Sequence, residues 1–274
     1  DECAFIDVTP YERETVRNLR AFQTVRQFAQ AFRRNWSRWG NVEYTAFWLN
    51  LGGIVNKPRY DARELYDHAD ILHDAMIRTM RRVEAMNEKD LTMLVNGLGR
   101  IKNAQTWHFN PDVWHTVAGR VVQLGDTLDA RALSNIADVY AAQNIYDARL
   151  FRMVATAAIR KIETFQLRDL VTLARAYATI EHRNLVLFRV IGDAFVNKID
   201  RANVLELSNM AYSCAQALYT DVGLFRAIGL SASQKLDDFQ EQSLCNMAWA
   251  FAVANVFSKE LFRDTNAFVK RCLE

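Results

Sequence analysis

The chain has 274 residues, of which 50% are apolar and 24% charged, and its 34 basic and 32 acidic residues leave a formal net charge of +2 at pH 7. No run of about 18 apolar residues occurs, which excludes a membrane-spanning helix. The charge is too balanced to indicate nucleic-acid binding by itself. Only three prolines and ten glycines interrupt the chain, and this scarcity of breakers favours helices.

The first 41 residues predict a basic N-terminal helical cap. Thr9 and Pro10 supply the capping hydroxyl and the proline at the first helical position that typically open a helix. Between residues 13 and 38 the only acidic residue is Glu14. The arginines of this segment are Arg13, Arg17, Arg20, Arg26, Arg33, Arg34 and Arg38. They form either a basic arm for a negatively charged partner or simply the solvated face of a helix.

Residues 42–112 predict helix pairs of irregular spacing. Residues 42–54 favour a first helix, which a long loop containing Pro58 follows. Residues 91–98 favour the next first helix, and the loop after it is lengthened. Gly97 and Gly99 lie inside a helix, which indicates a close contact with another helix.

Residues 113–274 contain an internal repeat with a period of 37 residues. The tripeptide Leu-Phe-Arg begins at residues 150, 187, 224 and 261. A second apolar anchor keeps the same step and begins at Leu133, Leu170, Leu207 and Leu244. Two independent anchors in one register indicate a repeat architecture.

Both halves of each repeat have helical spacing. Leu133, Ile136, Ala137, Tyr140 and Ala141 fall on one stripe of a helix, and the short links between the halves make the two helices antiparallel. Such pairs bury their apolar faces only against neighbouring pairs. The sequence therefore predicts an all-α fold, an α-solenoid of about six helix-pair repeats of 37 residues over residues 42–274, preceded by the helical cap.

The repeat resembles that of a known family. The units LSNMAYSCAQALYTDVGLFRAIG and LCNMAWAFAVANVFSKELFRDTN, which begin at Leu207 and Leu244, resemble heptatricopeptide and octotricopeptide repeat proteins, the group that includes RAP-domain and FAST-kinase-like proteins. The resemblance is good over residues 91–274 and looser before them. No RAP domain is visible in this chain, so the nuclease-like part of the family has no counterpart here.

The resemblance implies an organellar, typically mitochondrial, RNA-binding protein. We expect a role in RNA metabolism or within a mitochondrial ribosome, with mRNA or rRNA as ligand and ribosomal or other subunits as partners. The localisation expected is the mitochondrial matrix, although no targeting peptide is visible after Asp1. The alternative is a scaffold subunit of a mitochondrial complex that holds protein partners and does not touch RNA.

The predicted RNA-binding positions lie opposite the apolar stripe of each first helix. The third and sixth places of that helix, with one tenth place, hold Asn96, Arg100, Asn135, Asp138, Thr172, Arg175, Asn209, Tyr212, Asn246 and Trp249. Amide, charged and aromatic side chains at these places suit a reader of one base per repeat. Two alternatives stay open: the polar side chains bind nearby backbone, or the aromatic ones pack between repeats.

The second helices add two basic columns at the same period. The arginines of the Leu-Phe-Arg anchor are Arg152, Arg189, Arg226 and Arg263. The lysines near the helix ends are Lys161, Lys198 and Lys235. Either column is able to bind phosphates, but acidic residues follow the lysines at the same period, so charge pairing between repeats is the alternative.

Residues typical of catalysis or of cofactor binding do not form a recognisable motif. The chain has no phosphate-binding glycine loop and no nucleophile elbow. His68 and His73 are five residues apart and so face different sides of a helix. Cys214 and Cys245 fall in apolar helical patterns and are expected to be buried. We therefore expect no enzyme, no cofactor and no metal site.

Overall fold

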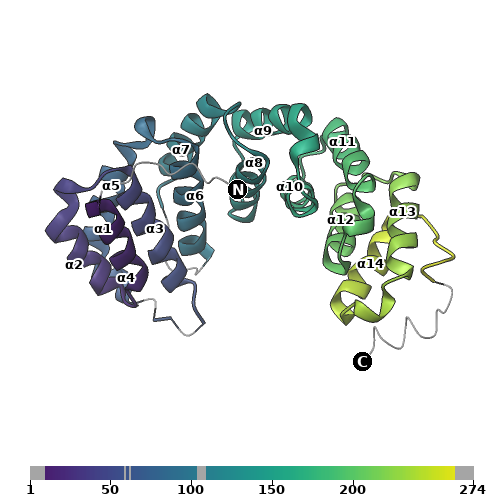
Figure 1. Ribbon diagram of the computed structural model, residues 1–274, viewed down its shortest axis with the longest axis horizontal. Coiled ribbons are helices and arrows are strands. Elements are labelled where there is room, and N and C mark those ends of the chain that lie inside the picture. The colour runs from purple at the N-terminus through teal and green to yellow at the C-terminus, as the bar shows by residue number, and fades with distance from the viewer. Residues whose placement is uncertain (1–9, 59, 62, 104–108, 263–274) are drawn as a thin grey trace. The chain divides into compact units, whose positions relative to one another are not determined.

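The protein is described here by a computed structural model that places residues 10–58, 60–61, 63–103 and 109–262 (Figure 1). Within these ranges the regular structure is helical throughout. None of the described helices is long and apolar enough to cross a membrane. The chain divides into two compact units, residues 1–128 and 129–274, and each is taken by itself below.

The first unit contains seven α-helices and two short 3-10 turns among its described residues. Their bounds are α1 Pro10–Ala21, α2 Val25–Asn35, η1 Trp36–Arg38, α3 Asn41–Val55, α4 Arg63–Asp67, α5 Ala69–Met80, η2 Val83–Ala85, α6 Glu88–Asn103 and α7 Pro111–Leu124. Pro10 is the first described residue of α1, and Thr9, the predicted capping residue, lies outside the described residues.

These helices form two layers. Helices α1, α3 and α6 pack side by side in one layer, and α2, α5 and α7 pack in the other. The closest approach is between α3 and α6, where a Cβ atom on Gly97 would lie 2.6 Å from the backbone of Trp48. The predicted close helix contact at Gly97 is thus confirmed. Gly52 of α3 faces the same crossing, since its Cβ would lie 2.5 Å from the Gly97 carbonyl oxygen.

The core of the first unit is aromatic. The ring of Phe32 contacts those of Trp39, Tyr44 and Phe47 at centroid distances of 5.7, 6.4 and 6.0 Å. All four side chains are buried. The edge-to-face packing of Phe32 against Trp39 and Tyr44 fixes the orientation of these rings as well as burying their area. The segment from α2 through η1 to α3 is therefore held in one conformation.

The second unit repeats one helix pair with high regularity. Its described elements are α8 Ala130–Ala142, α9 Ala148–Lys161, η3 Ile162–Thr164, α10 Leu167–Thr179, α11 Leu185–Val196, η4 Ile199–Arg201, α12 Val204–Gln216, α13 Val222–Ser233, η5 Leu236–Asp238 and α14 Glu241–Ala254. The first helices α8, α10, α12 and α14 pack side by side in one layer, and α9, α11 and α13 form the second (Figure 1). This stacking of helix pairs is that of an α-solenoid-like helical repeat, as predicted.

The two sequence anchors are the core of this stack. The leucines of both anchors are at most 3% exposed from Leu133 to Leu261. Ala137, Ala174 and Ala211 are fully buried between neighbouring first helices, because a side chain this small lets two helix backbones approach closely. The period of 37 residues is therefore the distance along the chain from one helix to its equivalent in the next pair.

Each first helix of this unit ends on a left-handed residue. These residues are Asn144, Glu181, Leu218 and Asn255, with φ between 52° and 56°. In the third repeat, the amide of Leu218 donates to the Ala215 carbonyl oxygen and the amide of Tyr219 donates to that of Cys214. This pair of hydrogen bonds is a Schellman motif. It turns the chain sharply into the second helix.

One expectation about the core is wrong. Cys214 is fully buried, whereas Cys245 is exposed. Cys245 occupies the place of Ser134 and Ser208 in earlier repeats, and both serines are buried. The hydroxyl of Ser208 donates to the Ser243 carbonyl oxygen of the following first helix. Among the described residues no first helix follows α14, so Cys245 has no such cover.

Candidate nucleic-acid interface

The third and sixth places of each first helix in the second unit lie on one face of that helix. A residue three positions further along a helix lies on the same face, and α8, α10, α12 and α14 stack side by side. All eight side chains are half-buried or exposed: Asn135, Asp138, Thr172, Arg175, Asn209, Tyr212, Asn246 and Trp249. We call these eight residues the repeat stripe. At the sixth place, the side chains of the stripe change from charged on α8 and α10 to aromatic on α12 and α14.

Asp138 and Arg175 of the repeat stripe bind each other. The Arg175 Nε and Nη2 atoms donate to the two carboxylate oxygens of Asp138 at 3.0 and 2.8 Å. The Arg175 side chain remains 55% exposed and that of Asp138 25%. Burial raises the pKa of Asp138, and the neighbouring guanidinium only partly offsets this effect. The forked pairing leaves Arg175 accessible but already engaged.

Tyr212 and Trp249 also pair across neighbouring repeats. Their ring centroids are 4.8 Å apart with an interplanar angle of 36°. Each ring nevertheless stays open to solvent, Tyr212 at 36% and Trp249 at 43%. The two rings therefore pack between neighbouring repeats, which was one alternative to RNA binding. Part of each ring nevertheless remains accessible to a ligand.

The polar side chains at the third place are mostly free. Asn135, Thr172 and Asn209 make no hydrogen bond to any other described side chain or to the described backbone. The Asn246 Oδ1 atom accepts a hydrogen bond from Gln242 Nε2 at 3.0 Å. Three repeats thus present an unused amide or hydroxyl next to the variable sixth residue.

The two candidate residues of the first unit lie on α6. Asn96 is half-buried and Arg100 is exposed. A Cβ atom built on Gly53 of α3 would lie 3.8 Å from Arg100 Nη1, so this arginine extends across the neighbouring first helix. These two residues form a separate patch, described within the first unit alone.

The three described arginines of the second-helix column are exposed. Arg152 lies on α9, Arg189 on α11 and Arg226 on α13, and none of the three makes an ion pair or side-chain hydrogen bond with a described residue. Arg263, the fourth member, lies outside the described residues. The column belongs to the second layer, so the repeat stripe and the arginine column are presented by different helices.

The lysine column has a structural role instead of a free charge. Lys198 Nζ donates to the Phe165 carbonyl oxygen at 2.6 Å, and Lys235 Nζ donates to that of Ala202 at 2.6 Å. Both acceptors follow the 3-10 turn of the preceding repeat. Acidic partners were the alternative considered from the sequence, but these two lysines bind backbone carbonyl groups and so join neighbouring repeats.

Other candidate chemistry is limited in the described part of the chain. No group of three or more His, Cys, Asp and Glu side chains there is placed to hold a metal ion. Burial raises the pKa of the Cys214 thiol to about 12, so this cysteine is a neutral core residue at physiological pH.

The seven arginines between residues 13 and 38 are all exposed.

Comparison with known families identifies one match. The sequence model described as RESC6, RNA-editing substrate-binding complex 6 protein, matches residues 54–274. No curated protein matches the chain. The matched residues include the whole repeat stripe and the arginine column. The match supports the coarser content of the predicted resemblance, an RNA-associated helical protein, whereas the heptatricopeptide and RAP-domain assignment stays a prediction.

Proposed function

The chain belongs to the RNA-editing substrate-binding complex 6 family, and we propose that it is a helical-repeat subunit of a mitochondrial RNA-editing complex that contacts single-stranded RNA directly. The family match over residues 54–274 is the observation that carries this proposal. It favours an editing complex over a ribosome as the assembly in which the protein works.

The chemistry of the repeat stripe supports direct contact with unpaired bases. Tyr212 and Trp249 offer exposed ring faces, on which bases of any sequence stack. Asn135, Thr172 and Asn209 offer unused hydrogen-bonding groups at the same distance along each helix, and groups of this kind recognise the edges of splayed bases. A net charge of only +2 means that stacking and hydrogen bonds must supply much of the affinity.

Within the repeat stripe, an RNA phosphate would have to compete with Asp138 for the Arg175 guanidinium. RNA that uses the Arg175 guanidinium has to displace or share the Asp138 carboxylate, which holds two of its nitrogen atoms. The Arg175 side chain remains 55% exposed in this pair, so a phosphate is able to reach the guanidinium and compete with the carboxylate. Arg175 would therefore contribute less to binding than a free arginine.

A scaffold role without RNA contact is the second candidate. Large apolar side chains are exposed on the second-layer helices, including Leu185, Val186, Val222 and Leu230, each 47–58% exposed. Such side chains are typical of surfaces that bind proteins. This role is compatible with membership of a multisubunit complex, but it does not explain the free polar groups of the repeat stripe.

Titration of a fluorescently labelled single-stranded RNA with the full chain, followed by anisotropy over a salt series, tests the proposal. We expect binding that weakens as salt rises, because counterions are released from the phosphates. Trp249→Ala should weaken binding roughly tenfold, since loss of one stacked base costs about 1–3 kcal/mol. Trp249→Phe should retain most of the affinity because the ring remains.

Controls separate RNA contact from loss of folding and from bulk charge. Arg175→Ala and Arg201→Ala each remove one exposed arginine, the first from α10 and the second from η4, but only Arg175 lies in the repeat stripe. Thermal unfolding should be similar for both variants. If the wild-type chain does not bind RNA at low salt, or if both arginine variants weaken binding equally, the repeat stripe is not an RNA-binding surface and the scaffold role is favoured.

A further inference from the structure

The first unit contains a small basic hollow that the sequence analysis did not anticipate. It is lined by residues from η1, α3 and the end of α5, and its volume is about 280 Å³. The lining residues are Trp36, Ser37, Tyr44, Arg78, Arg81 and Arg82. We call it the Trp36 hollow. Three arginines and two aromatic rings converge on a space at the small end of ligand pockets, which typically measure about 300–1,000 Å³.

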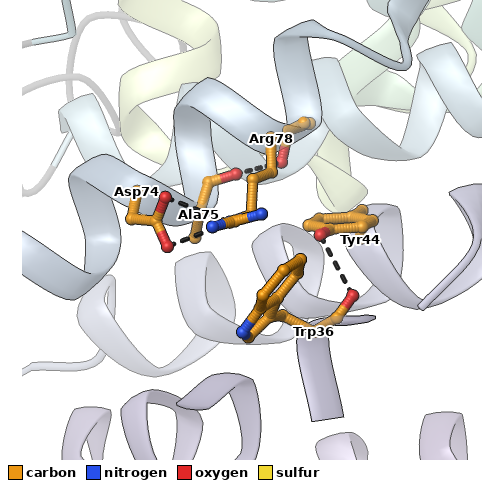
Figure 2. A network of polar contacts seen from close by, with 6 residues as sticks. Trp36, Tyr44, Asp74, Ala75 and Arg78 are labelled. Atoms are coloured by element: carbon orange, nitrogen blue, oxygen red, sulfur yellow. Dashed lines mark hydrogen bonds and ion pairs between the residues drawn. The ribbon is translucent and has the colours of Figure 1, made fainter. Parts of the chain in front are cut away.

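Arg78 lies over the Trp36 ring. Its guanidinium carbon lies 3.5 Å from the ring centroid, and its Nε atom donates to both carboxylate oxygens of Asp74 at 3.0 Å (Figure 2). Asp74 therefore holds the guanidinium over the indole. The Trp36 side chain is still 38% exposed, so part of this stack faces solvent.

The other two arginines carry charge that no acidic side chain balances. Neither Arg81 nor Arg82 forms an ion pair with a described residue. The Arg82 guanidinium carbon lies 5.5 Å from the Tyr44 ring centroid. Burial raises the pKa of Tyr44 although both Arg82 and Arg78 oppose this shift, so the phenol stays neutral and does not cancel the charge. Three arginines against Asp74 leave the hollow strongly positive.

The position of Trp36 is set before any ligand arrives. The Tyr44 hydroxyl donates to the Trp36 carbonyl oxygen at 3.4 Å (Figure 2), and the Tyr44 ring packs edge-on against Trp39 at 5.6 Å. Because both Trp39 and Tyr44 are buried in the aromatic core, the ring at the mouth of the hollow is attached to a rigid base. A site of this kind loses little entropy when it binds.

We propose that the Trp36 hollow binds one nucleotide of single-stranded RNA, with the base on the Trp36–Arg78 stack and the phosphate held by Arg81 and Arg82. The choice of RNA as ligand rests on the proposed function, but the site is separate from the repeat stripe. The planar groups of indole and guanidinium are both able to stack on the face of a base. Arginine forks match phosphate oxygens, and one nucleotide is the unit that a hollow of this size accommodates.

An acidic protein segment is the competing ligand. Carboxylates would also satisfy Arg81 and Arg82, but an acidic chain has no planar group for the stack. The features that distinguish the two ligands are thus Trp36 and its exposed face. The contribution of the Trp36 ring to binding therefore has to be measured separately from that of the arginine charges.

Photocrosslinking of the full chain to a short oligouridylate that contains 4-thiouridine is the direct test. We expect an adduct in the peptide that contains Trp36. Arg81→Glu should weaken binding of this RNA about tenfold and reduce the adduct in proportion. Trp36→Ala should abolish the adduct and weaken binding, whereas Trp36→Phe should keep the affinity within about threefold because it keeps a ring for the base.

The matched control is Arg63→Glu, which makes the same charge change on α4. Arg63 is exposed, does not line the hollow and lies outside the basic segment of residues 13–38, so this variant should bind and crosslink almost as the wild-type chain does. Circular dichroism melting should show all four variants folded. Equal losses for Arg63→Glu and Arg81→Glu would mean that bulk charge binds the RNA, and the hollow would not be a site.

The outcomes also separate this proposal from the proposed function. Crosslinking at Trp36 that survives Trp249→Ala supports the hollow even if the repeat stripe fails its own test. RNA binding that depends on Trp249 but leaves no adduct at Trp36 overturns the hollow and keeps the stripe. Competition by polyglutamate as effective as that by unlabelled oligouridylate at equal charge overturns the nucleotide and identifies an acidic protein ligand.

Discussion

At the scale of single residues, the left-handed residues show where the fold imposes a backbone conformation that the residue type does not favour. Asn144 and Asn255 are suited to positive φ, but Glu181 and Leu218 occupy the same place with φ of 55° and 56°. A left-handed conformation costs an ordinary residue about 1–2 kcal/mol. The sequence could not predict these turns from residue type, because the stacking of the repeats imposes them. Only the period of 37 residues, which relates all four positions, could have indicated them.

Leu218→Gly should stabilise the protein. Leu218 is 52% exposed, so little burial is lost, and glycine adopts positive φ without strain. The free energy of unfolding should rise by about 0.5–1 kcal/mol, as urea denaturation followed by circular dichroism would measure. Leu230→Gly is the matched control: Leu230 is equally exposed but lies inside α13, where glycine should cost about 1 kcal/mol. If both changes destabilise, the turn at Leu218 is not strained.

At the scale of elements, the helices were predictable and their partners were not. Apolar residues at helical spacing located α3, α6 and all the helices of the regular repeat, because burial on one side imposes that spacing. The contact between Asp138 and Arg175 needs the register of two stacked helices, yet their separation of 37 residues is the repeat period itself. Trp36 and Arg78 lie where the period is irregular, so no spacing pointed to the Trp36 hollow.

Gly97→Ala should destabilise the contact between α3 and α6. The added methyl group would lie 2.6 Å from backbone atoms of Trp48 and Leu49, and backbone cannot move aside as a side chain does. Overpacking of this kind costs about 1–3 kcal/mol or more. Gly119→Ala in α7 is the matched control, since its methyl group meets nothing within 4 Å and should stabilise the helix by about 1 kcal/mol. Equal melting temperatures for the two variants would contradict the close crossing.

At the scale of the whole molecule, the stability of each helix pair depends on its contacts with the adjacent pairs. Helix α10 is covered by α8 on one side and α12 on the other, whereas α14 contacts only α12 within its layer among the described residues. The exposed Cys245 and the buried Ser208 at equivalent places show this difference in single side chains. In such arrays the free energy of unfolding is close to a sum of the intrinsic stability of each repeat and the stabilisation from each interface between adjacent repeats.

Native-state hydrogen exchange of the full chain should therefore give unequal protection along the layer. We expect the amides of α14 to exchange at least about tenfold faster than those of α10, a difference of about 1.4 kcal/mol in opening free energy. Helices α10 and α12 serve as internal controls for each other, because each has a neighbour on both sides, and their protection should agree. Uniform protection from α8 to α14 would mean that the second unit opens all at once, which contradicts the prediction.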